Sequence, residues 1–170
     1  MKKHKFRDNW PAPNDYLLEL GRMTTVWGSL ESAVNIAISR FAGFQSPLDF
    51  RAVIMVAHSN FQQRVNIISS LCEQLVPKYP RLKVYKSVVA KIQAAQKARN
   101  KFAHNPIVWN QDTQDVKVSY VTARGSMKTS VEVVKIHDIM EATAKIHEAM
   151  CALHTLVTGR ELKPMWERDA

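Results

Sequence analysis

The spacing of hydrophobic residues along the chain predicts a mainly helical protein. Over residues 14–43, apolar side chains recur every three or four positions, as on one face of an amphipathic helix. This stripe comprises Leu20, Met23, Trp27, Leu30, Val34, Ile38 and Phe41. Gly43 has the conformational freedom that the residue after a helix often needs. A similar stripe predicts a last helix over residues 136–158, and Gly159 marks its end.

Polar residues mark the starts of two further helices. Ser46 and Pro47 are expected to be the cap and the first residue of a short, nearly all-apolar helix. Ser59, with Gln62 three residues later, has the spacing of a capping box for another helix, which ends before Pro77. We therefore expect two helices between residues 46 and 77.

The period of the pattern changes between residues 107 and 134. Val116, Val118 and Tyr120 alternate with polar residues, as in a strand with one buried face. We expect strands in three segments rich in β-branched and aromatic residues: 107–109, 116–121 and 131–134. Residues 124–126, Arg-Gly-Ser, form a plausible turn. The pattern predicts a small antiparallel hairpin or three-stranded meander inserted between helices.

The composition supports a single domain over residues 1–170. Hydrophobic residues make up 46% of the chain, and 170 residues are enough to bury a substantial core. The expected fold is mainly α, an up-and-down bundle of four to five helices with the β insert at 107–134. Residues 1–13 and 160–170 are expected to be flexible termini.

No targeting or membrane signal is evident in the sequence. The amino-terminal residues are basic but have no apolar segment typical of a signal peptide, and no apolar run approaches the ~18 residues of a membrane span. Cys72 and Cys151 fit no zinc or redox spacing, which favours a reducing environment. We expect a cytoplasmic protein that does not associate with a membrane and that needs neither a metal ion nor a cofactor.

Positive charge is concentrated in one part of the chain. The excess of Lys and Arg over Asp and Glu is 24 − 15 = 9. No acidic residue occurs between Glu73 and Asp112. The same segment contains eight basic residues: Lys78, Arg81, Lys83, Lys86, Lys91, Lys97, Arg99 and Lys101. Such a segment either attracts polyanions such as nucleic acid or forms an ordinary solvated helix face.

An arginine continues the buried stripe of the helix predicted over residues 81–104. That stripe comprises Leu82, Tyr85, Val88, Val89, Ile92 and Ala95. At 100° per residue, Arg99 is the next position on it. A buried guanidinium needs a carboxylate or an anionic ligand. Glu31, on the flank of the first helix's stripe, is the expected partner.

Two more polar residues lie at the edge of this stripe. Asn100 and His104 are four positions apart and therefore share a helix face, whereas Arg99 and His104 diverge by about 140° on an ideal helix. For both to reach one substrate, either the last turn must unwind or two chains must share the site. Pro106 favours unwinding because it disfavours helical geometry at the residue before it.

These residue types can cleave RNA without a metal ion. Histidine transfers protons near neutral pH, and arginine binds phosphate oxygens and stabilises charge that develops on phosphorus. RNA supplies its own nucleophile, the 2′-hydroxyl group. Its attack on the adjacent phosphate leaves a 2′,3′-cyclic phosphate and a 5′-hydroxyl.

The segment ARNKFAHN, residues 98–105, resembles the motif of the HEPN (higher eukaryotes and prokaryotes nucleotide-binding) domain family. Arg99 and His104 are separated by four residues, and a polar residue, Asn100, follows the arginine. WGSLE, residues 27–31, resembles the family's first helix, in which an acidic residue often faces the motif. The motif also lies at the end of the penultimate long helix, as in that family.

The resemblance implies a metal-independent endoribonuclease that works as a homodimer with the motif at the interface, often as a toxin or defence effector. Arg99 would then stabilise the phosphate and His104 would transfer protons, while Asn100 and Glu31 would orient them. An antitoxin or a nucleotidyltransferase would be a typical partner. The sheet at 107–134 is a departure, because compact toxin members of the family do not generally have one after the motif.

Other basic residues are candidates for RNA binding. Lys97 and Lys101 lie beside the motif, and Arg64 borders an apolar stripe, where it contacts either phosphate or another protein surface. His147 and His154 are about 10.5 Å apart along the last helix, too far for one metal ion, and are interpreted as edge-of-core residues. Two alternatives remain open: a non-catalytic HEPN module that binds a nucleotide or a partner protein, and a basic helical scaffold for nucleic acid.

Overall fold

The computed structural model describes residues 7–47, 49–124 and 126–168, which form helices and one small sheet. The α-helices are α1 (Asn14–Phe41), α2 (Phe50–Val56), α3 (Phe61–Leu75), α4 (Tyr85–Ala103) and α5 (Ile136–Thr158). Short 3-10 helices are η1 (Pro80–Val84) and η2 (Met165–Glu167), and the strands are β1 (Ile107–Trp109), β2 (Val116–Arg124) and β3 (Ser126–Val133). The predicted helical bundle with a small antiparallel sheet is confirmed.

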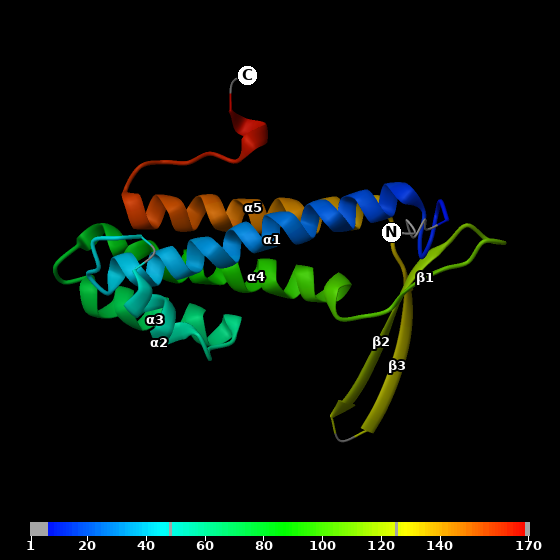
Figure 1. Cartoon of the computed structure of the whole chain (residues 1–170), viewed down its shortest axis with the longest axis horizontal. Helices are drawn as coiled ribbons and strands as arrows, with labels where there is room; N and C mark the ends of the chain where they lie inside the picture. Colours follow the sequence, from blue (N-terminus) through cyan, green and yellow to red (C-terminus); the bar gives the residue numbers. More distant parts are fainter. Residues whose placement is uncertain (1–6, 48, 125, 169–170) are drawn as a thin grey trace, which may run out of the picture.

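The three long helices form the body of the bundle. In Figure 1, α1 and α5 lie side by side and run in the same direction, while α4 packs along α5 and runs the opposite way. One hydrophobic core joins these helices, and its most completely buried side chains include Leu30, Val34, Ile92, Ile146 and Leu153. No helix in the part of the chain that the structure describes is long and apolar enough to cross a membrane.

Both predicted glycine ends are confirmed. Gly43 follows α1 with φ 87°, and Gly159 caps α5 with φ 72°, conformations that favour glycine. The last turn of α5 is also held by Arg81, whose guanidinium donates to the carbonyl oxygens of Leu156 (2.7 Å) and Val157 (3.2 Å). The start of the η1–α4 segment is therefore fixed to the end of α5.

The starts of the two short helices differ from the prediction. Asp49, not Ser46, caps α2, because its carboxylate accepts a hydrogen bond from the backbone N–H of Arg51. The capping box of α3 is formed by Asn60 and Gln63, one residue later than expected.

The sheet is an antiparallel meander in the order β1-β2-β3. Val118 of β2 pairs with Ile107 of β1 and with Glu132 of β3, and Val116 and Val118 are buried. The strands β2 and β3 are longer than predicted and extend away from the bundle (Figure 1). The predicted turn at 124–126 is centred on residue 125, which lies outside the described residues.

The described part of the tail from residue 160, which we predicted to be flexible, makes several contacts with α5. The backbone N–H of Leu162 donates to the hydroxyl of Thr155, and that of Met165 donates to Nε2 of His147, both at 3.0 Å. The ring of Trp166 packs at 5.4 Å from the imidazole of His147. Polar side chains on the outer face of α5 thus hold the tail. Residues 1–6 and 169–170 lie outside the described part of the chain.

Candidate active site

The carboxyl end of α4 departs from helical geometry at His104. The helix ends at Ala103, and His104 has φ −117° and ψ 1°. The side-chain amide of Asn105 donates to the carbonyl oxygens of Asn100 (3.3 Å) and Lys101 (2.9 Å), which have no partner within the helix. The predicted unwinding before Pro106 is therefore confirmed.

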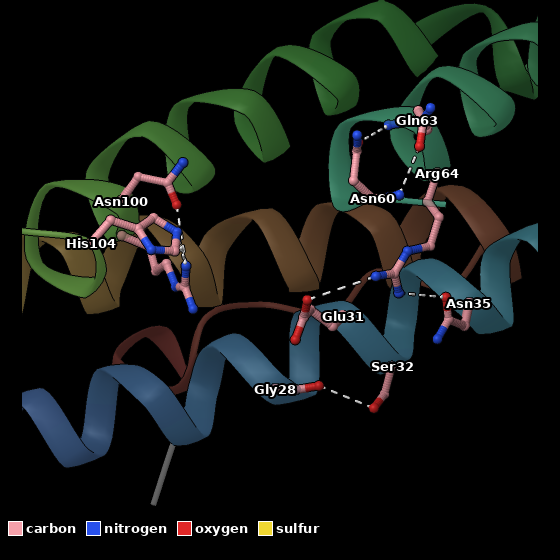
Figure 2. A network of polar contacts seen from close by, with 10 residues as sticks. Gly28, Glu31, Ser32, Asn35, Asn60, Gln63, Arg64, Asn100 and His104 are labelled. Atoms are coloured by element: carbon pink, nitrogen blue, oxygen red, sulfur yellow. Dashed lines mark hydrogen bonds and ion pairs between the residues drawn. The ribbon is translucent and has the colours of Figure 1, made fainter. Parts of the chain in front are cut away.

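Unwinding brings the imidazole of His104 to the guanidinium of Arg99. Nη1 of Arg99 lies 2.9 Å from Nε2 of His104 and 3.3 Å from Oδ1 of Asn100. Figure 2 shows the side chains of Asn100 and His104 turned toward the same place at this end of α4. A guanidinium has only donors, so Nε2 of His104 must accept, and the imidazole proton is on Nδ1. Within a single copy of the protein, the permanently charged guanidinium of Arg99 is therefore hydrogen-bonded to an imidazole nitrogen that can accept a proton.

Arg99 rests on an aromatic ring from α1. Its guanidinium carbon lies 5.1 Å from the centroid of the Trp27 ring, within the range of a cation–π contact. Trp27 is only 5% exposed, and its ring packs against that of Phe61 at 4.5 Å. The sequence placed Trp27 in the apolar stripe of α1 but gave no direct sign that it would support the arginine.

Glu31 does not form the ion pair that we predicted with Arg99. Its carboxylate lies 4.0 Å from Nη2 of Arg64 on α3, and Nη1 of Arg64 donates to Oδ1 of Asn35 at 3.1 Å. Figure 2 shows Glu31 on α1 between Arg64 and the end of α4 that carries His104. Within the described residues, Arg99 has no carboxylate partner, so its positive charge remains available to an anion.

The other predicted basic residues occupy different environments. The side chain of Arg64 is only 18% exposed, and its Nε is buried without a hydrogen-bond partner. Lys97 is exposed, whereas Nζ of Lys101 pairs with Oε1 of Glu132 on β3 at 2.7 Å. Arg64 therefore joins α3 to α1, and Lys97 remains open to solvent.

Other reactive groups lie outside this cluster. Burial raises the pKa of the Cys72 thiol to about 11 and also raises the pKa of Cys151, so both thiols stay protonated at neutral pH. Among residues 7–47, 49–124 and 126–168, no group of three or more His, Cys, Asp or Glu residues could hold a metal ion. The arrangement at the end of α4 can bind an anion through Arg99 and accept a proton through His104.

No family model matches this chain, and it matches neither a curated protein nor a solved structure. Its function therefore has to be inferred from the fold and from the geometry of the site.

Proposed function

We propose that this protein is a metal-independent endoribonuclease of the HEPN type. The observation that carries the proposal is the 2.9 Å contact between Arg99 and His104 at the unwound end of α4. A guanidinium without a carboxylate partner favours a phosphate, and an exposed imidazole beside it can accept a proton. The mainly helical fold and the absence of acidic residues from the motif helix itself agree with an RNA substrate.

In the proposed reaction, the 2′-oxygen of RNA forms a bond to phosphorus and the bond from phosphorus to the 5′-oxygen breaks. Nε2 of His104 accepts the proton of the 2′-hydroxyl, and the departing 5′-oxygen takes up a proton from an acid. Arg99 stabilises the negative charge that develops on the phosphate oxygens, and Asn100 keeps Arg99 in place. The products are a 2′,3′-cyclic phosphate and a 5′-hydroxyl.

The need for both a base and an acid supports a homodimer. One chain contributes one imidazole to the cluster, and a second copy would contribute another. A surface for such a pairing is available on α2, where Phe50, Val53, Ile54 and Met55 are between 48% and 69% exposed. We further propose that the enzyme acts on cytoplasmic RNA as a toxin or defence effector, restrained by an antitoxin or a nucleotidyltransferase.

The proposal is tested by incubating the protein with single-stranded RNA, and with DNA of the same sequence, in excess EDTA. We expect cleavage of RNA alone and cyclic phosphate ends by mass spectrometry. The variants Arg99→Ala and His104→Ala should each lower the rate by roughly 100-fold or more. Arg99→Lys should also be strongly impaired, because an ammonium group lacks the planar fork that binds two phosphate oxygens.

Arg40→Ala and His154→Ala are the matched controls. Both residues are exposed, and the carboxyl end of α1, where Arg40 lies, is at the opposite end of the bundle from the carboxyl end of α4 (Figure 1). These variants should cleave RNA at the wild-type rate. Cleavage that needs a divalent ion, or that survives in His104→Ala, would refute the proposal. Salt-sensitive RNA binding without cleavage would favour the nucleic-acid scaffold instead.

A further inference from the structure

A pocket lies on the other side of α4 from Trp27. It has a volume of about 980 Å³ and is formed by α4, α5 and β2. This size is at the upper end of the ~300–1,000 Å³ typical of small-molecule sites. Its depth arises from small side chains, because Ala94 and Ala98 of α4 and Ala142 of α5 line it where larger residues would fill it. The pocket is therefore a consequence of the sequence of these two helices.

The charged residues that line the pocket are all lysines. Lys97, Lys101 and Lys145 line it, and no acidic residue does. Lys101 is engaged by Glu132, but the exposed ammonium groups of Lys97 and Lys145 have no ion-pair partner among the described residues. Because they come from different helices, α4 and α5, they present two positive charges to one ligand. This arrangement favours a phosphate group.

The β insert contributes an aromatic wall. Tyr120 of β2 lines the pocket, and its hydroxyl donates to Oε2 of Glu132 on β3 at 3.1 Å. Oε1 of Glu132 also lies 2.7 Å from Nζ of Lys101, and this ion pair connects the β insert to α4. The Tyr120 ring is thus held beside an apolar floor, a surface suited to a nucleobase.

Asn100 connects this pocket to the candidate active site. Its side chain lines the pocket, and its Oδ1 lies 3.3 Å from Nη1 of Arg99. A ligand that extends past Asn100 would reach from the pocket to the Arg99–His104 pair. A flexible polyanion with bases, such as single-stranded RNA, meets this requirement.

We propose that the pocket binds a nucleotide of single-stranded RNA next to the scissile phosphate. Lys97 and Lys145 bind a phosphate of that nucleotide, and its base lies beside Tyr120 on the alanine floor. This inference rests on the proposed ribonuclease function and assigns a role to the β insert, which forms the wall of a substrate site.

The test uses binding of a fluorescent, uniformly 2′-O-methylated oligoribonucleotide, which has no free 2′-hydroxyl and cannot be cleaved. Affinity is measured by anisotropy at several salt concentrations. The double variant Lys97→Ala/Lys145→Ala should bind about tenfold more weakly and with a salt dependence smaller by about 1.4 units on the log–log plot. Ala94→Trp should also weaken binding about tenfold, through loss of base stacking in the filled pocket, with the salt dependence unchanged.

The matched control is Lys83→Ala/Lys86→Ala, which removes the same charge from η1 and the first turn of α4, outside the pocket. It should bind like the wild type. All four lysines are exposed, so the variants should fold, and circular dichroism checks this.

The outcomes separate the two proposals. If the wild type binds the oligonucleotide but never cleaves RNA, and the pocket variants lose binding, the ribonuclease proposal fails and only the assignment of the pocket as an RNA-binding site stands. If the pocket variants cleave and bind like the control, the pocket assignment is overturned and the ribonuclease proposal stands. Failure of the wild type to bind the oligonucleotide, or pocket-dependent binding of polyglutamate in its place, would overturn the RNA assignment.

Discussion

The closest polar contact of Arg99 is its hydrogen bond to the imidazole of His104, and this hydrogen bond would have to break during cleavage. Nε2 of His104 accepts a hydrogen bond from Arg99 and cannot at the same time accept a proton from RNA. A phosphate competes for the guanidinium because a hydrogen bond between two oppositely charged groups is stronger than one from the guanidinium to a neutral imidazole. Substrate binding would therefore free the base. In the proposed mechanism, the two events are coupled through this one hydrogen bond.

His147 of α5 provides a pH-dependent contact with the carboxyl-terminal tail. Burial, and secondly the charge of Arg168, lower the pKa of His147 below its usual value near 6.5. Neutral His147 accepts the hydrogen bond from the backbone N–H of Met165, and the imidazolium cannot. This stabilisation of the docked tail is fully present above pH 6.5 and is lost as the pH falls through the folded-state pKa.

We therefore expect the tail to detach in mild acid. The amide resonance of Met165, followed by NMR from pH 7.5 downward, should shift with the titration of His147 and move toward its random-coil position. In His147→Leu the same resonance should be near that position throughout. A Met165 resonance that stays unchanged while His147 titrates would contradict this contact.

Part of the candidate site could be predicted from the sequence. Helical phase correctly placed Arg99 on the side of α4 that faces the bundle, where it contacts Trp27, but the residue is only partly buried; Pro106 correctly indicated unwinding. The predicted partner of Arg99 was wrong because a guanidinium does not need a carboxylate beside it where the flat face of an aromatic ring, here Trp27, accommodates it. Glu31 was then free to pair with Arg64, whose position on the neighbouring helix is a tertiary property.

The break at the end of α4 depends on Asn105. Its amide satisfies two carbonyl oxygens that the helix leaves without partners, and this allows the chain to turn away at His104. Asn105→Ala should cost about 1 kcal/mol of stability. It should reduce RNA cleavage more sharply, by roughly 10- to 100-fold, because the imidazole loses its fixed position. Thermal unfolding and single-turnover cleavage would measure the two effects.

Asn110→Ala is the matched control for this positioning residue. Oδ1 of Asn110 accepts from the backbone N–H groups of Asp112 (2.9 Å) and Thr113 (3.3 Å) in the loop between β1 and β2. Its replacement should lower stability by a similar amount while leaving cleavage intact. Equal losses of cleavage in the two variants would show that Asn105 has no special role in the site.

The long helices were easier to predict than the short ones. The stripes of α1 and α5 extend over many turns, so local ambiguities average out and the glycine ends were found correctly. The start of α3 offered two adjacent polar residues, Ser59 and Asn60, with similar capping preferences. In the structure, Asn60 caps the helix, and the next residue, Phe61, packs against Trp27. A single sequence does not reveal this tertiary contact.

The proposed homodimer has a testable candidate interface on α2. Only Ala52 and Val56 of this helix are buried, and its large apolar residues are exposed. If a second copy covers them, Ile54→Asp should convert a dimer into a monomer in light scattering. The same change should abolish cleavage without unfolding the chain, since Ile54 contributes little to the core of one copy.

Leu18→Asp is the corresponding control, because Leu18 is equally exposed, at 62%, on a different part of the surface. It should leave the assembly unchanged. A wild-type protein that remains monomeric at all concentrations tested, while still cleaving RNA, would exclude the shared site.

The hydrogen bonds from Arg81 to the last turn of α5 affect the dynamics of the entire bundle. They fix the beginning of the η1–α4 segment, whereas the other end of α4 passes into the exposed residues Ala103 and His104. Local opening requires the least free energy where few contacts have to be broken. Amide exchange is therefore expected to be slow at the start of the helix and to become faster toward the motif. The fluctuations that would admit a polymer would then occur at the end that carries the Arg99–His104 pair, while the remainder of the helix stays packed.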